Sequence, residues 1–84
     1  MSYRVFIGAW NNGEPEWAHL DVGSLPWNDA KTVMLQHLAR FQDDECGHCR
    51  DDAAKEFVRL QAAAPGDFEA CVDGEDYVIV QEGT

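Results

Sequence analysis

Two cysteines separated by two residues stand in the middle of the chain, in the stretch DDECGHCRDD over residues 43–52. Cysteine sulfur can attack a disulfide or bind a metal ion, and a Cys-x-x-Cys pair brings two sulfurs close together. A histidine lies inside the pair and carboxylates flank it on both sides. Three interpretations follow: a redox dithiol, half of a metal site, or the turn between two helices.

The tetrapeptide CGHC resembles the active-site motif of protein disulfide isomerases over these four residues. That resemblance implies thiol–disulfide exchange, with Cys46 as the attacking thiol and Cys49 as the resolving thiol. In the thioredoxin-like fold of that family the motif directly follows a strand, whereas an amphipathic helical pattern precedes it here. Glu45 replaces the family's aromatic residue before the first cysteine, and the acids around the pair oppose a thiolate.

A structural zinc site usually has four protein ligands, and the pair supplies two at a suitable spacing. The alternative hypothesis is therefore a zinc or redox site that uses Cys46, Cys49 and His48. His48 lies between the two cysteines, so we expect it to point away from a site that they share. Cys71 and His37 are predicted to lie on a distant strand face and in a helical core stripe. We expect no cofactor, with zinc as the alternative, and two sulfurs that cover a helical turn.

Charge is the strongest compositional feature, with sixteen acidic and six basic residues and a net charge of -10. Such a surface repels nucleic acid and anionic membranes and attracts basic partners. The acids near the cysteine pair are the candidate partner-binding residues: Asp43, Asp44, Glu45, Asp51, Asp52 and Glu56. A second group surrounds the last predicted turn: Glu69, Asp73, Glu75 and Asp76. These carboxylates either keep the protein soluble or imitate nucleic-acid phosphates toward a basic groove.

The length of 84 residues predicts one domain over residues 1–84. No apolar run approaches the roughly 20 residues of a membrane span. The N-terminal stretch MSYRVFIGAW is typical of a first strand and lacks the pattern of a signal peptide. Three cysteines are too few, and odd in number, for a disulfide scaffold. We therefore expect a cytoplasmic protein.

The elements that position the pair follow from periodicity. Residues 3–10 and 16–22 predict a hairpin around Asn12-Gly13. A helical stripe then runs from Ala30 to Phe41, with Asn28 or Asp29 as the expected N-cap. A second helix is predicted after the cysteine pair, with Asp51 and Asp52 in its first turn and Pro65-Gly66 at its end.

The last hairpin gives the clearest local signal, because Asp73-Gly74 is a preferred two-residue turn. That turn pairs Val72 with Glu75, Ala70 with Tyr77 and Phe68 with Ile79, and it places these apolar side chains on one core face. The predicted fold is α+β, in the order β-β-α-α-β-β, with an antiparallel sheet and a helical hairpin packed on one face.

The chain as a whole resembles short proteins of actinobacterial phages, in its acidity, its preference for Arg over Lys, and stretches such as CGHCRDDAAKEF and VDGEDYVIV. The resemblance implies a non-enzymatic accessory protein in the host cytoplasm that binds a host or phage protein. We expect a binding protein, an inhibitor or nucleic-acid mimic for a partner with a basic surface, without direct binding of nucleic acid or membrane. An open sheet edge would also allow a homodimer.

Overall fold

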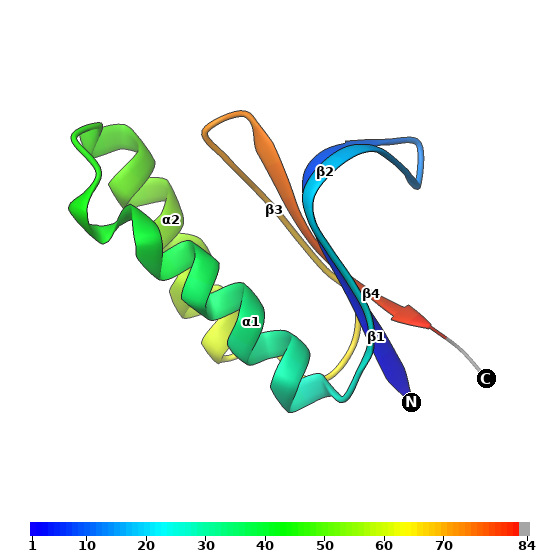
Figure 1. Ribbon diagram of the computed structural model, residues 1–84. Helices are drawn as coiled ribbons and strands as arrows, with labels where there is room; N and C mark the ends of the chain where they lie inside the picture. The colour runs from blue at the N-terminus through cyan, green and yellow to red at the C-terminus, as the bar shows by residue number, and fades with distance from the viewer. Residues whose placement is uncertain (83–84) are drawn as a thin grey trace.

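The computed structural model describes residues 1–82 and contains a four-stranded antiparallel sheet with two helices on one of its faces (Figure 1). The elements are β1 (Ser2–Asn11), β2 (Glu14–Leu25), α1 (Trp27–Ala39), the 3₁₀ helix η1 (Arg40–Asp43), α2 (Gly47–Gln61), β3 (Phe68–Val72) and β4 (Glu75–Glu82). The strand order is β2-β1-β4-β3, so the two hairpins join through β1 and β4. The predicted element order and α+β class are confirmed.

A two-residue turn joins β1 to β2. Asn12 and Gly13 have positive φ angles of 52° and 80°, the combination that a type I′ turn requires. The pairing of the two strands contains register shifts, one of them between Ile7 and Gly8. A Cβ added at Gly8 would lie 2.1 Å from the carbonyl oxygen of Trp17. The strands therefore approach each other there more closely than any side chain at position 8 would allow.

The β3–β4 hairpin has the predicted register. Val72 pairs with Glu75, Ala70 with Tyr77, and Phe68 with Ile79. Asp73 and Gly74 adopt φ angles of 53° and 77°, as their turn type requires. The five predicted core-face side chains are all buried: Phe68, Ala70, Val72, Tyr77 and Ile79.

The hydrophobic core lies between the sheet and the helices. Helix α1 contributes Ala30, Met34 and Leu38, and helix α2 contributes Ala53 and Leu60. These side chains pack on buried residues of the sheet: Tyr3, Val5, Ile7, Phe68, Ala70, Val72, Tyr77 and Ile79. Burial of this shared face positions both helices, and with them the connection that carries the cysteine pair.

The start of α1 differs from the prediction. The helix begins at Trp27, and the N-cap position is held by Pro26 without a side-chain hydrogen bond, so neither Asn28 nor Asp29 is the cap. Proline suits this place because its fixed φ leads the chain into a helix and it has no N–H to satisfy.

The start of α2 also differs. The helix begins at Gly47, directly after Cys46, so the cysteine pair forms its first turn and Asp51 and Asp52 lie beyond that turn. The last helical residue is Gln61, ahead of the predicted stop at Pro65-Gly66. The helix begins earlier than predicted because the Cys46 sulfur accepts the backbone N–H of Cys49 and caps the helix.

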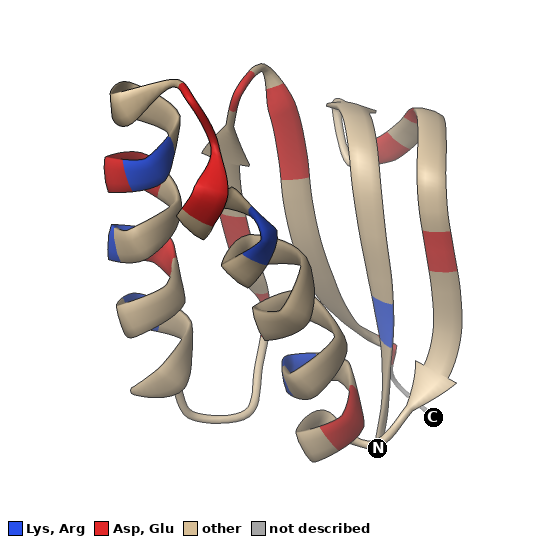
Figure 2. Ribbon diagram, turned by 60° about the vertical axis from the view of Figure 1, so that its left-hand side comes forward, with Lys and Arg blue, Asp and Glu red and all other residues tan. Residues whose placement is uncertain are grey.

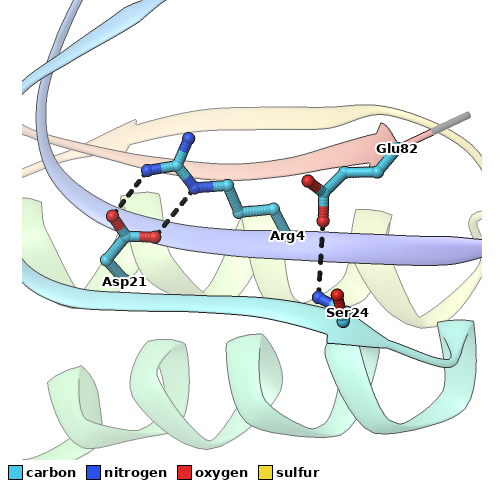
Figure 3. Close-up of polar contacts among 4 residues, drawn as sticks. All are labelled: Arg4, Asp21, Ser24 and Glu82. Atoms are coloured by element: carbon cyan, nitrogen blue, oxygen red, sulfur yellow. Dashed lines mark hydrogen bonds and ion pairs between the residues drawn. The ribbon is translucent and has the colours of Figure 1, made fainter.

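The face of the sheet away from the helices has a small apolar cluster and polar contacts between strands. Phe6 and Val78 are buried there, and Trp10 packs edge-on against Phe6 with 5.1 Å between ring centroids. Arg4 binds Asp21, with 2.8 Å between Nε and Oδ1, and Glu82 accepts the backbone N–H of Ser24 at 3.3 Å (Figure 3). The second contact reaches from β2 to β4 across β1.

The ends of the described chain lie side by side, because Ser2 pairs with Glu82 (Figure 1). They lie at the opposite end of the molecule from the connection between η1 and α2. Strands β2 and β3 form the two edges of the sheet, and the homodimer through such an edge stays a prediction. No helix within residues 1–82 is long and apolar enough to cross a membrane.

Candidate functional site

The connection between η1 and α2 folds around Asp44. Its Oδ1 accepts the backbone N–H of Cys46 at 2.8 Å, which is the side-chain bond of an Asx turn. Its own backbone N–H donates to the carbonyl of Phe41 at 3.1 Å, and the guanidinium of Arg50 donates to its carbonyl. Asp44 therefore fixes where the first cysteine stands.

Cys46 is the N-cap residue of α2. Its Sγ accepts the backbone N–H of Cys49 at 3.4 Å, which satisfies one of the free amides of the first helical turn. That N–H, donated to the sulfur, lowers the pKa of the Cys46 thiol. Cys46 is exposed to solvent, so the more acidic thiol of the pair is the accessible one.

Cys49 lies behind Cys46 and is buried, with 7% of its surface exposed. Its pKa is raised to about 12, because its thiol donates to the Cys46 sulfur and because burial disfavours the charged form. The two sulfurs are thus unequal: one is exposed at the helix end, and the other is buried and has the higher pKa.

The carboxylate of Asp44 completes a cluster with the two sulfurs. One ligand atom from each of Asp44, Cys46 and Cys49 lies within 4.8 Å of the other two. His48 is not part of this cluster, since its side chain is 83% exposed and its Nε2 lies 3.2 Å from the Asp52 carboxylate. The predicted set of Cys46, Cys49 and His48 is therefore brought together only in part, and Asp44 is the residue that the prediction missed.

The other two candidate ligands lie elsewhere, as expected. His37 is half-buried on α1, where burial lowers the pKa of its imidazole and the Arg40 guanidinium lies 3.2 Å from its Nδ1. Cys71 is exposed on β3, and its pKa is raised by partial burial and by the charge of Asp76. Neither lies in the cluster of Asp44 and the cysteine pair.

The six acids near the pair divide into two kinds. Asp43, Glu45 and Asp51 are exposed. The other three have bonding partners within the protein, namely Cys46 for Asp44, His48 for Asp52 and Arg59 for Glu56. The first three carboxylates are therefore the better placed for contact with another molecule.

The two acidic groups of the sequence meet in space. A cleft of about 230 Å³ is lined by Asp44 from the η1–α2 connection, by Asp73 and Glu75 from the β3–β4 turn, and by His19, Arg40, Phe41 and Tyr77. The acidic segments of the η1–α2 connection and of the β3–β4 turn lie at the end of the molecule away from the termini (Figure 2). Three carboxylates and one permanent cation, Arg40, face this cleft, so its lining is net negative.

His19 and Glu75 join strands that are not neighbours. The His19 Nε2 contacts the Glu75 carboxylate, which links β2 to β4 across β1, and both residues line the cleft. Phe41 and Tyr77 also line the cleft and pack edge-on, with 6.2 Å between ring centroids. Sequence reasoning could not find this arrangement, because it depends on the strand order and on the helices packed above.

Comparison with protein-family models, with curated proteins and with solved structures gave no match to this chain.

Proposed function

We propose that the protein is a small acidic binding protein that attaches to a basic surface of another protein. The contact region is the acidic end, defined as the carboxylates of Asp43, Asp44, Glu45, Asp51, Asp73 and Glu75. The observation that carries this proposal is the cleft that Asp44 shares with Asp73 and Glu75. Acids collected on one face attract a basic partner and orient its approach.

The cleft explains how such a partner would be recognised. A Lys or Arg side chain entering it meets the carboxylates of Asp44 and Asp73, with the rings of Phe41 and Tyr77 beside them. Carboxylates supply charge and hydrogen-bond acceptors, and aromatic rings add attraction for a cation. The exposed acids Asp43, Glu45 and Asp51 would contact basic residues around the inserted side chain.

A basic partner of this kind includes proteins that bind nucleic acid through Lys and Arg. The acidic end would then occupy the groove in place of phosphates and inhibit the partner. This form of the proposal predicts competition: nucleic acid and this protein cannot both occupy the same groove.

Two variants of equal charge test the proposal. Asp43→Asn/Glu45→Gln/Asp73→Asn removes three carboxylates from the acidic end, and one of them, Asp73, lines the cleft. Glu16→Gln/Asp29→Asn/Glu69→Gln removes three exposed carboxylates elsewhere and serves as the matched control. Peptides selected for binding to the immobilised wild-type protein provide the probe, and their affinities are measured at low and at high salt.

We expect peptides rich in Lys and Arg that bind the wild type and the control variant alike. The acidic-end variant should bind them about tenfold more weakly at low salt, a difference that fades as salt screens the charges. Equal losses in both variants would mean that net charge alone attracts the peptides and would refute a defined acidic end.

Thiol–disulfide exchange is a second candidate function, favoured by the arrangement of an exposed sulfur at the helix end with a second sulfur behind it. The Cys46 thiolate would attack a substrate disulfide and release one substrate thiolate. Cys49 would then attack the Cys46 sulfur, forming the Cys46–Cys49 disulfide and releasing the second. The substrate disulfide is reduced to two thiols, which take up the two protons that the cysteines lose.

Reduction of insulin by dithiothreitol measures this activity. The wild type should accelerate the reaction, and Cys46→Ser should lose the effect, whereas Cys71→Ser should keep it. A wild-type rate equal to the reaction without protein would eliminate this candidate and would leave the acidic end untouched as a proposal.

A further inference from the structure

We propose that Asp44, Cys46 and Cys49 form a zinc site in which the fourth position is open to solvent. This site goes beyond the binding function proposed above and does not depend on it. Its basis is the cluster of three ligand atoms, one from each residue, that lie within 4.8 Å of one another.

The cluster needs little movement to accept the ion. Tetrahedral zinc with Zn–S distances near 2.3 Å places its two sulfurs about 3.8 Å apart, and its sulfur–oxygen separations are somewhat shorter. The three ligand atoms lie within 4.8 Å of one another, a limit about one ångström above the sulfur–sulfur distance in a zinc site. Rotation of the exposed Cys46 side chain and of the Asp44 carboxylate can supply such a change without moving the helix.

The backbone already has the form of a ligand loop. Asp44 binds the N–H of Cys46, and the Cys46 sulfur accepts the N–H of Cys49, so both acceptors are oriented by amides before any ion arrives. Outer hydrogen bonds of this kind hold metal ligands in place and tune their affinity. Arg50 donates to the backbone carbonyl of Asp44 and holds this part of the loop in place.

The ligand set selects the metal. Two thiolates and one carboxylate suit borderline-soft zinc, whereas calcium and magnesium require oxygen ligands throughout. Cys46 is exposed, so a bound ion would be reached by water at its fourth position.

Binding is measured on the reduced protein without oxygen. Co²⁺ reports the ligands, because thiolate coordination produces a sulfur-to-metal charge-transfer band, and Zn²⁺ added afterwards should displace it. Native mass spectrometry of the same protein should show one bound Zn²⁺. The Asp44→Asn variant should bind Zn²⁺ at least about tenfold more weakly, because an amide is a poorer ligand than a carboxylate.

Asp44→Asn is a fair test, because the amide oxygen can still accept the N–H of Cys46 and keep the turn. Cys46→Ser keeps a capping acceptor in the same way and should abolish the charge-transfer band contributed by that sulfur. The matched controls are His48→Ala and Cys71→Ser, which should bind like the wild type. Far-ultraviolet circular dichroism establishes that each variant is folded.

Several results would overturn the site. These are a wild-type protein without bound Zn²⁺, a Co²⁺ complex without a sulfur band, and a loss of binding in His48→Ala or Cys71→Ser. Full affinity in Asp44→Asn would also refute the proposed ligand set. Zinc binding that fails while insulin reduction succeeds would separate this proposal from thiol exchange at the same cysteines.

Discussion

The two helices of this protein both pack on the sheet through buried side chains, but their N-terminal ends differ. Helix α1 starts at Trp27 behind Pro26, with no side-chain cap and with the carboxylate of Asp29 in its first turn. Helix α2 starts behind Cys46, whose sulfur is the cap, and has no acid in its first turn. A carboxylate stabilises the start of α1, whereas sulfur atoms occupy the start of α2, where a carboxylate would normally stand. The difference makes the start of α2 the place where the thiol and zinc proposals can be tested.

The largest effect expected from this contrast is on the rates at which the thiols react with iodoacetamide. The pKa of Cys49 is raised by its hydrogen bond to the Cys46 sulfur and by burial, so near pH 8 Cys49 should be alkylated much more slowly than an ordinary thiol. Cys46 should be alkylated first as pH rises, since its pKa is lowered, and Cys71 later, since its pKa is raised. Peptide mass spectrometry after short pulses at several pH values measures the order. Alkylation of Cys71 at lower pH than Cys46 would contradict the role of the helix end.

The shared anchoring of the helices is tested by truncation of one buried side chain in each. Met34 on α1 and Leu60 on α2 are both fully buried. Met34→Ala and Leu60→Ala should each lower the free energy of unfolding by about 3 kcal/mol, measured by urea titration. Neither should change the pH at which Cys46 reacts. If only Leu60→Ala shifted that pH, the packing of α2, and not the start of the helix, would control the reactivity of the Cys46 thiol.

The sulfur cap is tested by exchanging its acceptor. Cys46→Ala leaves the backbone N–H of Cys49 without its acceptor and should lower the midpoint of thermal unfolding by about 3 °C. Cys46→Ser retains an acceptor and should stay close to the wild type. Equal midpoints for the alanine and serine variants would mean that a capping acceptor at position 46 does not stabilise α2.

The smallest expected effect is at the start of α1. Asp29→Asn removes the charge from the first turn and should cost about 0.5 kcal/mol at low salt, measured by urea titration. Asp51→Asn is the counterpart on α2 and should not destabilise the protein, because Asp51 lies beyond the first turn. A loss in Asp29→Asn that persists in concentrated salt would argue against a charge effect.

The sequence predicts the last hairpin well and the cysteine site poorly, for a physical reason. Asp73-Gly74 fixes the pairing of its neighbours locally, so the register and the buried face follow from a few adjacent residues. The start of α2 depends on which side chain accepts a free amide, and cysteine is a rare choice for that task. A signal was present, since Asp44 stands two residues before Cys46, the spacing of an Asx turn. The cleft between Asp44 and Asp73 depends on long-range packing and has no local signature.

The pairing of Ser2 with Glu82 determines how the molecule can be tethered. Ser2 and Glu82 lie on the side opposite the η1–α2 connection, so an affinity tag, a surface linker or a fused carrier attached next to them would leave from that side (Figure 1). The cysteine pair and the acidic end would then project away from the support. Immobilisation through a terminus therefore leaves the acidic end and the cysteine pair accessible, whereas coupling through Cys46 would modify the pair itself.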